Sequence, residues 1–377
     1  MPQVYAGADV FDGTVLHRSA TVVVEDGMVM GIFPSEPKPA GEVVRLPGGI
    51  LAPGFIDLQV NGGGGWQVDG TADAARIAAL CDVQARLGAT GILPTLITDT
   101  PDATAAVIAA GVAAKGVPGF LGLHLEGPHL DPRRKGAHDP TLIRPMGDAD
   151  LHRLLDAAAA LPALMLTVAP EAVTDGQITR LAAAGVVVSL GHSDCDAATV
   201  MRAMAAGARC ATHLFNAMSP LGNREPGLVG AVLSGSLAAG LIADGLHVAP
   251  ATMRVALAAR RTGIFLVSDC MGVAGTAATE LVLGGRRVLR AGGRLTLEDG
   301  TLAGADLTLD RAVGGLVREV GISPERALAM ATSVPAGVMG LQHRHGHLMA
   351  GRAADMVHLD AAFALQAVWR GGEPVHM

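Results

Sequence analysis

Four polar residues each follow a short apolar segment, at a point where a buried strand would end. They are one glutamate, two histidines and one aspartate: Glu126, His192, His213 and Asp269. One carboxylate and two neutral imidazoles suit Zn2+ or Fe2+ and leave a position open for water. A lone histidine is more often a hydrogen-bonded core residue, but three such groups at strand ends favour a metal site formed by Glu126, His192 and His213.

Asp269 could be a further ligand, a helix N-cap or a catalytic base. Because the other three residues already complete a ligand set, a carboxylate beside the metal is most useful as a base. It could take a proton from water and pass it to a leaving nitrogen. The four residues together therefore predict a metal-dependent hydrolase.

Three neighbouring side chains allow other interpretations. Cys195 and Cys270 lie close in sequence to His192 and Asp269, so a thiolate ligand or nucleophile is an alternative. We disfavour it, because no lysine or arginine lies near either cysteine in sequence and buried cysteine is common. His129 could supplement the metal site, but we expect it to line the pocket wall.

A second group of residues could bind an anion such as phosphate. Asn216 and Ala217 follow His213 at a strand-to-helix turn, where backbone amides are available. Arg224 lies in a loop with glycine and proline, and His247 ends the sequence Asp-Gly-Leu-His. The alternatives are a solvated loop charge for Arg224 and a polar residue beside a helix for His247.

The elements that would position these residues alternate between apolar strands and alanine-rich helices. We expect eight strands, at 50–58, 92–97, 120–125, 164–168, 186–190, 209–212, 237–243 and 264–268. Most are followed by a helical segment, for example 72–87 and 197–206. This alternation predicts an α/β fold, a parallel (β/α)8 TIM-like barrel with its active site at the carboxyl ends of the strands.

Both ends of the chain differ from this pattern. Residues 1–47 alternate short β-like runs with turns, including a hairpin signal at Asp26-Gly27, and the tail is β-like again. We expect residues 1–48 and 351–377 to form a small β-sandwich domain beside a barrel of residues 49–350. Residues 281–302, rich in glycine and β-like, are expected to form an inserted hairpin.

Composition restricts the classes of partner. The chain has 377 residues, of which 50% are hydrophobic, and this is enough for a large core. Its net charge of −7 without a basic block argues against nucleic acid, and glycines interrupt its longest uncharged run, which argues against a membrane span. Scattered cysteines and an N-terminus without signal-peptide features favour the cytoplasm.

Seven short motifs together resemble the N-acetylglucosamine-6-phosphate deacetylases of the amidohydrolase superfamily. They are PGFIDLQVNG at 53–62, HLEGP at 124–128, KGAH at 135–138, GHS at 191–193, THLFNAM at 212–218, DGLH at 244–247 and SD at 268–269. The resemblance implies an enzyme that removes acetate from N-acetylglucosamine 6-phosphate. It also implies that Glu126, His192 and His213 bind the metal and that Asp269 is the acid/base.

The resemblance implies roles for further residues. His138 would hydrogen-bond the carbonyl oxygen of the acetamide. The phosphate and the sugar would be held by Asn216, Ala217, Arg224 and His247. In the resembled family the residue that matches Arg224 reaches the phosphate from the neighbouring subunit, which predicts a homodimer.

Many members of the superfamily bind two metals through a His-x-His pair on the first strand. Here that pair is replaced by Gln59 and Asn61. We therefore expect one divalent metal ion per subunit, with Zn2+ preferred over Fe2+, Co2+ or Mn2+. Gln59 would make at most a weak or water-mediated contact.

Three alternative functions remain. One is a deacetylase of N-acetylgalactosamine 6-phosphate. The second is a cyclic-amide hydrolase such as a dihydroorotase or hydantoinase, which is disfavoured because the His-x-His pair is absent and no lysine follows the strand at 164–168. The third is a phosphosugar-binding regulatory protein without catalysis, and Asp269 argues against it because a sensor needs no general base.

Overall fold

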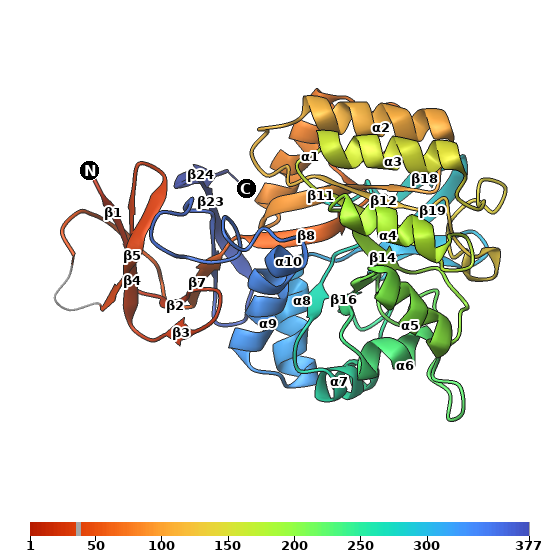
Figure 1. Ribbon diagram of the computed structural model, residues 1–377. Helices are drawn as coiled ribbons and strands as arrows, with labels where there is room; N and C mark the ends of the chain where they lie inside the picture. The colour runs from red at the N-terminus through yellow and green to blue at the C-terminus, as the bar shows by residue number, and fades with distance from the viewer. Residues whose placement is uncertain (35–38, 377) are drawn as a thin grey trace.

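The computed structural model describes residues 1–34 and 39–376, and its largest part is a barrel of parallel strands (Figure 1). Neighbouring strands pair in the order β17-β16-β15-β14-β13-β12-β11-β8, so each strand lies beside the next one in the chain. The strands are β8 (Phe55–Val60), β11 (Ala89–Ile97), β12 (Leu123–Glu126), β13 (Leu164–Val168), β14 (Val187–Leu190), β15 (Cys210–Ala211), β16 (Ala238–Leu241) and β17 (Ile264–Leu266). The predicted (β/α)8 barrel is confirmed.

A helix follows each strand from β8 to β16 and packs on the outside of the barrel. The seven are α1 (Ala74–Arg86), α2 (Pro101–Ala113), α3 (Asp148–Ala160), α4 (Asp175–Ala183), α5 (Ala197–Ala206), α6 (Gly227–Ser234) and α7 (Pro250–Ala259). Their ends follow local chemistry: the Asp196 side chain caps α5, and Gly207, with a φ of 120°, ends it. Within the described parts of the chain, no helix combines the length and the apolar character that a bilayer crossing needs.

Further elements follow the last barrel strand or lie in its loops. After β17 the chain forms α8 (Leu309–Gly315), η2 (Leu316–Val320), α9 (Pro324–Ala331) and α10 (Ser333–Val338). Short loop elements are β9 (Gly62–Gly63), β10 (Trp66–Gln67) and η1 (Pro132–Arg134). Helices α9 and α10 contact β8 and β17 and so cover the place where the first and last barrel strands meet.

The predicted first strand, 50–58, is two strands in the structure. Gly54 separates β7 (Ile50–Pro53) from β8, and a Cβ at Gly54 would lie 2.0 Å from the hydroxyl oxygen of Thr90. Strand β7 pairs with β22 (Met356–Leu359) and β2 (Asp9–Phe11) outside the barrel, and only β8 pairs with β11. Both strands are buried, so their apolar residues read as one continuous run in the sequence.

The two ends of the chain form two sheets on one side of the barrel (Figure 1). One, in the order β5-β4-β1-β6, contains β1 (Gln3–Ala6), β4 (Ala20–Glu25), β5 (Met28–Pro34) and β6 (Glu42–Arg45). The other, in the order β24-β23-β22-β7-β2-β3, adds β2 (Asp9–Phe11), β3 (Leu16–His17), β22 (Met356–Leu359), β23 (Leu365–Arg370) and β24 (Glu373–Val375). We propose that residues 1–48 and 351–377 form a small domain. Because β7 pairs with β2 and β22, this strand belongs to the same domain.

The predicted hairpin at 281–302 is part of a four-stranded antiparallel sheet. Its strands are β18 (Glu280–Leu283), β19 (Arg286–Ala291), β20 (Arg294–Leu297) and β21 (Leu302–Ala305). Val288 and Leu295 are fully buried between this sheet and the segment that follows β17. The sheet therefore has a small core of its own and can form one wall of a cavity at the barrel mouth.

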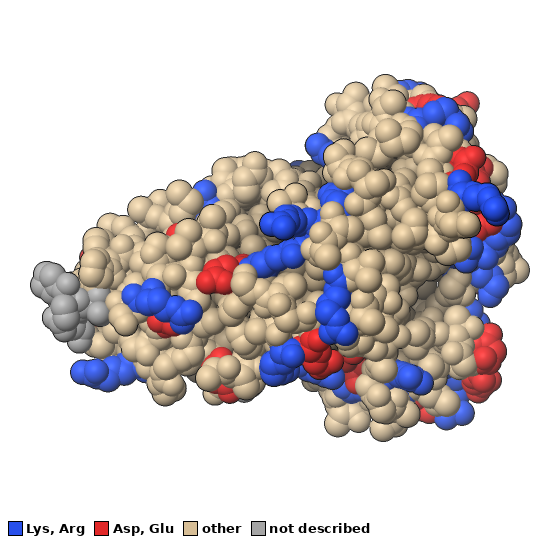
Figure 2. Space-filling model, turned by 90° about the horizontal axis from the view of Figure 1, so that it is seen from below, with Lys and Arg blue, Asp and Glu red and all other residues tan. Residues whose placement is uncertain are grey.

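The surface carries both signs of charge. Figure 2 shows the molecule from below, with blue and red side chains interspersed among many uncharged ones. No continuous basic area covers this face. This mixed charge agrees with the composition, which gave no sign of a nucleic-acid surface.

Strands β8 and β17 close the barrel at their carboxyl ends by a few specific hydrogen bonds. The backbone N–H of Asp269 donates to the carbonyl of Gln59 at 3.0 Å. The backbone N–H of Ser268 lies 3.2 Å from both carboxylate oxygens of Asp57. Burial raises the pKa of Asp57 to about 7. The closure is therefore held by a buried acid whose protonation changes near neutral pH.

Replacing Asp57 by asparagine should remove one source of pH dependence in stability. In an unfolded chain an aspartate has a pKa of about 3.9, so between pH 4 and 7 the folded protein binds more protons than the unfolded one. The free energy of unfolding of metal-free protein should therefore fall by roughly 2–3 kcal/mol from pH 5 to pH 8 because of this group alone. Urea unfolding of both proteins measures the difference, and parallel pH profiles would contradict it.

Candidate active site

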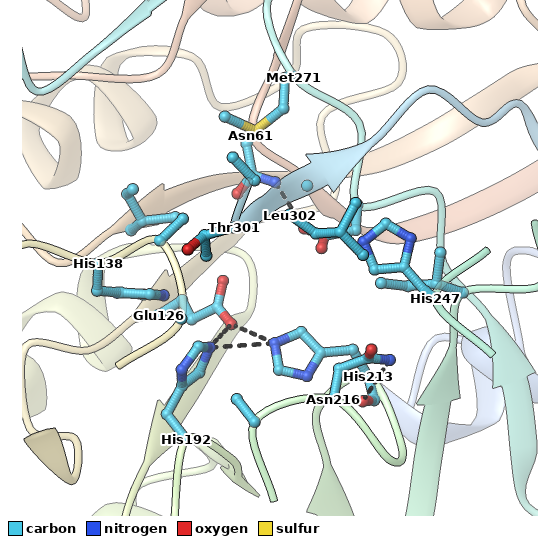
Figure 3. A pocket seen from close by; sticks show the side chains of 18 of the residues that line it. Asn61, Glu126, His138, His192, His213, Asn216, His247, Met271, Thr301 and Leu302 are labelled. Carbon is cyan, nitrogen blue, oxygen red and sulfur yellow. Dashed lines mark hydrogen bonds and ion pairs between the residues drawn. The ribbon is translucent and has the colours of Figure 1, made fainter. Parts of the chain in front are cut away.

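Eight of the nine predicted site residues line one cavity of about 250 Å³ at the carboxyl ends of the barrel strands (Figure 3). They are Glu126, His138, His192, His213, Asn216, Ala217, His247 and Asp269. Arg224 is the exception: it is exposed, in the loop before α6. The strand-end positions thus bring together residues that lie as far apart in sequence as Glu126 and Asp269.

The side chains of Glu126, His192 and His213 converge at the bottom of this cavity (Figure 3). One ligand atom from each lies within 4.8 Å of the others. The Nε2 atoms of the two histidines lie 3.1 Å and 3.0 Å from Oε1 of Glu126 and 3.1 Å from each other. Two imidazole nitrogens and a carboxylate oxygen at one point form a donor set that fits a single divalent metal ion.

The surroundings of His192 favour the form that can bind a metal. Its Nδ1 lies 2.8 Å from the carbonyl oxygen of Arg134. A carbonyl oxygen only accepts hydrogen bonds, so Nδ1 carries the proton and Nε2 of a neutral ring keeps its lone pair for the metal. Gly136 lies close to this ring, and a Cβ at that position would be only 3.3 Å from it. The absence of a side chain at Gly136 therefore leaves room for the His192 ring.

Glu126 supplies a fixed negative charge to the cluster. Burial opposes its ionisation, but the close contacts with His192 and His213 outweigh that effect and hold its pKa well below the usual range. The same contact acts on His213: burial disfavours the charged ring, yet the hydrogen bond with Glu126 raises its pKa. A buried carboxylate that stays ionised attracts a cation, which supports the metal site.

Four site residues have strained backbone conformations: Ala217, with a φ of 52°, and three residues that each follow a barrel strand. His192, His213 and Asp269 have φ values of 48°, 30° and 50°, in the left-handed region. For a residue with a side chain this region costs roughly 1–2 kcal/mol. Such strain is retained where it serves a function, and here each of these three residues turns sharply after its strand to direct its side chain into the barrel mouth.

Asp269 is buried at the cavity wall, where the Nδ2 of Asn61 donates a hydrogen bond of 2.7 Å to its Oδ1. Burial and, next, the charge of Glu126 raise the pKa of Asp269 to about 6. A carboxyl group with a pKa close to neutral can both accept and release a proton near neutral pH. These properties suit a general acid/base.

His138 lies beside the cluster of Glu126, His192 and His213, with its ring centroid 4.3 Å from that of His192. Burial, followed by the neighbouring His192, holds the pKa of His138 well below its ordinary value. The ring is therefore neutral at physiological pH. A neutral imidazole can donate one hydrogen bond to a carbonyl oxygen without carrying a charge.

Three of the four predicted anion-binding residues, Asn216, Ala217 and His247, line the cavity, and Arg224 does not. The Nδ1 of His247 is held 2.6 Å from Oδ2 of Asp244, which fixes the ring and leaves Nε2 for a ligand. The backbone N–H of Asn216 already donates to the carbonyl of His213 at 2.9 Å. The available donors at this turn are therefore the amide of Ala217 and the side chain of Asn216, whose contacts with neighbouring carbonyls are 3.3 and 3.4 Å long.

Both cysteines near the site are unsuited to catalysis. Burial raises the pKa of Cys270 to about 12 and that of Cys195 to about 11, so both thiols stay protonated. His129 does not line the cavity, contrary to our expectation, and its Nδ1 donates a hydrogen bond to the carbonyl of Arg144, 3.1 Å away. Gln59 directs its amide nitrogen at Oε2 of Glu126, 3.1 Å away.

Several cavity residues were missed by the sequence analysis. Thr301, Leu302 and Gly304 enter from the inserted sheet, and Asn61 holds Asp269. Nothing in residues 281–302 indicated that the insertion folds back over the barrel mouth. Asn61, by contrast, directly follows the strand β8, so the strand-end rule that found Glu126 could have found it as well.

The chain was compared with known proteins. Residues 50–376 match the amidohydrolase family. A protein of Shewanella sp. (strain ANA-3) named N-acetylgalactosamine-6-phosphate deacetylase is 37% identical over 97% of this chain and 94% of its own length. A protein of Rattus norvegicus named N-acetylglucosamine-6-phosphate deacetylase is 36% identical over 95% of this chain and 93% of its own length.

Solved structures of N-acetylglucosamine-6-phosphate deacetylases are also similar to this chain. The crystal structure of N-acetylglucosamine-6-phosphate deacetylase from Pasteurella multocida superimposes with a TM-score of 0.94 at 30% identity, over 99% of both chains. The enzyme from Mycobacterium smegmatis gives a TM-score of 0.91 at 31% identity over 100% of both chains. The chain belongs to the amidohydrolase family, among the N-acetylglucosamine- and N-acetylgalactosamine-6-phosphate deacetylases.

Replacing Glu126 by glutamine should abolish tight metal binding, because a neutral amide attracts a dication far less than a carboxylate does. Titration of stripped wild-type protein with Zn2+ should saturate at one equivalent, and the variant should show no tight site. Isothermal titration measures both. A Glu319→Gln variant, which changes an exposed glutamate of η2 outside the cavity lining, is the control and should keep the site. Saturation of the wild type at two equivalents would contradict the single site.

Proposed function

We propose that this protein hydrolyses the acetamide of N-acetylglucosamine 6-phosphate to glucosamine 6-phosphate and acetate. The observation that carries the proposal is the arrangement of one cavity: Asp269 and His138 both line it beside the convergent cluster of Glu126, His192 and His213. An amide bond placed over the cluster would have a proton donor and acceptor at its nitrogen and a hydrogen-bond donor at its oxygen.

The residues of the chain divide the reaction among them. Glu126, His192 and His213 would hold a divalent metal, which supplies positive charge that polarises the carbonyl and makes water more acidic. His138 donates a hydrogen bond to the carbonyl oxygen as negative charge develops there. Asp269 takes a proton from the attacking water while the water oxygen bonds to the carbonyl carbon and the π electrons of the carbonyl move onto its oxygen. Asp269 then gives that proton to the nitrogen as the carbon–nitrogen bond breaks, which yields the amine and acetate.

We propose Zn2+ as the metal, one ion per subunit. Two imidazoles and one carboxylate are a common ligand set for catalytic zinc. At the place of a second metal site, Gln59 and Asn61 direct their amide nitrogens toward Glu126 and Asp269. An amide nitrogen in this orientation donates hydrogen bonds and offers no lone pair to a cation.

N-acetylgalactosamine 6-phosphate is a second candidate substrate. The relative from Shewanella sp. carries that name, and its identity to this chain, 37%, is similar to that of the N-acetylglucosamine-6-phosphate deacetylases. The two sugars differ only in the configuration of one hydroxyl group. The residues that would read this hydroxyl lie at the end of the cavity with Asn216 and His247.

We propose that the protein is a homodimer in which Arg224 completes the partner's site. Arg224 and its neighbours from Leu221 to Pro226 are exposed, and the loop extends away from the barrel in Figure 1. Arg224 does not line the cavity of its own chain. An arginine that is to bind the 6-phosphate therefore has to reach a different cavity, and the site of a second subunit provides one.

The four free cysteines of the chain support a location in the cytoplasm.

An assay of acetate release tests the proposed function. Zn2+-loaded protein should hydrolyse N-acetylglucosamine 6-phosphate far faster than N-acetylglucosamine, and the ratio to N-acetylgalactosamine 6-phosphate decides between the two sugars. Dihydroorotate serves as the cyclic-amide comparison. Turnover of dihydroorotate without acetate release from either phosphosugar would overturn the proposal, and so would binding of the phosphosugars without any turnover.

Replacing Asp269 by asparagine should leave metal and substrate binding intact and slow turnover at least about a thousandfold, a loss of roughly 4 kcal/mol in transition-state stabilisation. The amide cannot accept a proton from water or pass one to the leaving nitrogen. Steady-state kinetics with metal analysis of the same sample separate the two effects. Loss of the metal in this variant, or near-normal turnover, would show that Asp269 is not the acid/base.

Replacing Arg224 by alanine should raise KM for the phosphorylated sugar about tenfold or more and hardly change activity on the non-phosphorylated sugar, because only the phosphate contact is lost. Mixing Arg224→Ala with Asp269→Asn chains tests the position of Arg224. One site of each mixed dimer then combines an intact Asp269 with an intact Arg224 of the other subunit, so a wild-type-like KM should reappear. If mixed dimers form but show no wild-type-like KM, Arg224 either acts in the site of its own chain or does not bind the phosphate.

A further inference from the structure

One ring nitrogen of His138 is held by two groups of a single residue. Thr98, the residue that follows β11, places its backbone N–H 3.3 Å from Nδ1 of His138. The hydroxyl oxygen of Thr98 lies 2.7 Å from the same nitrogen. Both side chains are buried, with exposed fractions of 6% for Thr98 and 3% for His138. Water therefore does not take the place of either contact.

These contacts decide which nitrogen of the ring carries the proton. A backbone N–H can only donate, so this contact, at 3.3 Å, favours an unprotonated Nδ1 of His138 that accepts. If Nδ1 carried the proton, two N–H groups would face each other in a buried place. The hydroxyl of Thr98 can donate to the same lone pair and strengthen this preference. The neutral ring is therefore the tautomer with its proton on Nε2.

The packing around Thr98 keeps its hydroxyl in contact with the ring. Gly127 lies beside it, and a Cβ at this position would come within 2.3 Å of the hydroxyl oxygen. Gly127 also has a φ of 89°, which residues with side chains rarely adopt. On its other face the ring of His138 packs edge-on against His192. The ring is thus held from two sides, and Figure 3 shows it directed toward Glu126.

We propose that Thr98 is a positioning residue for the reaction: it holds His138 as the Nε2–H tautomer, with that N–H available to the carbonyl oxygen of the acetamide. The inference rests on the proposed deacetylase function. Thr98 itself does not touch the substrate. With the other tautomer, Nε2 would present a lone pair to the carbonyl oxygen and would repel the charge that develops there. Thr98 therefore acts on the transition state through His138.

Replacing Thr98 by valine tests this role, because valine has nearly the same shape and keeps the backbone N–H but lacks the hydroxyl. We expect kcat for the phosphosugar to fall about tenfold, with KM and metal content nearly unchanged, since ground-state binding does not depend on the tautomer. Thr98→Ser restores the hydroxyl and should bring kcat back to within about threefold of wild type. Thr90→Val makes the same change at the other end of β11, outside the cavity lining, and should leave kcat unchanged.

A double-mutant cycle with His138→Gln separates positioning from a general loss of structure. If Thr98 acts only through His138, Thr98→Val should have almost no further effect on kcat in the His138→Gln background. The inference is overturned if Thr98→Val keeps kcat within twofold of wild type, or if it lowers kcat equally in both backgrounds. If the wild-type protein released no acetate from the phosphosugar, the proposed deacetylase function would be wrong. This result differs from those that would contradict the role of Thr98, so the two proposals can be tested separately.

Discussion

The parallel arrangement of the barrel strands is the constraint on which the site depends. Because neighbouring strands run in the same direction, their carboxyl ends open on one side, and a polar residue after any of them enters the same cavity. His192, His213 and Asp269 turn into that cavity through left-handed backbone conformations that a free chain would avoid. The hydrogen bonds between β8 and the residues after β17 close the barrel beside Asp269, so the closure of the fold and the position of Asp269 are set by the same contacts.

Three buried acids lie close together at this end of the barrel, and their surroundings give them different roles. Glu126 is held ionised by two imidazoles, so its pKa lies well below the usual range. Asp269 has no such partners, and burial together with the charge of Glu126 raises its pKa to about 6. Asp57 is enclosed by backbone N–H groups, and burial raises its pKa to about 7. One acid therefore attracts a cation, one can exchange protons and one joins two strands.

Local patterns in the sequence predicted the barrel and the strand-end residues of the cavity, whereas His138 was expected only from the family resemblance. Apolar runs alternating with alanine-rich helices define the fold, and a polar residue after each run is visible without any structure. Contacts between distant segments were not visible in this way. The separation of β7 from β8 at Gly54 depends on close packing against Thr90, and the approach of the inserted sheet to the cavity depends on its own small core. The pairing of Thr98 with His138 joins residues 40 positions apart, and neither residue is unusual by itself.

In the proposed complex, the cavity binds the acetamide with its oxygen at His138 and its nitrogen at residue 269. A crystal structure of the Zn2+-loaded Asp269→Asn variant with N-acetylglucosamine 6-phosphate would test this arrangement. We expect the carbonyl oxygen within hydrogen-bond distance of Nε2 of His138, the amide nitrogen beside residue 269, and the phosphate at the end of the cavity with Asn216 and His247. A sugar bound in the reverse direction, with its phosphate over Glu126, His192 and His213, would contradict it.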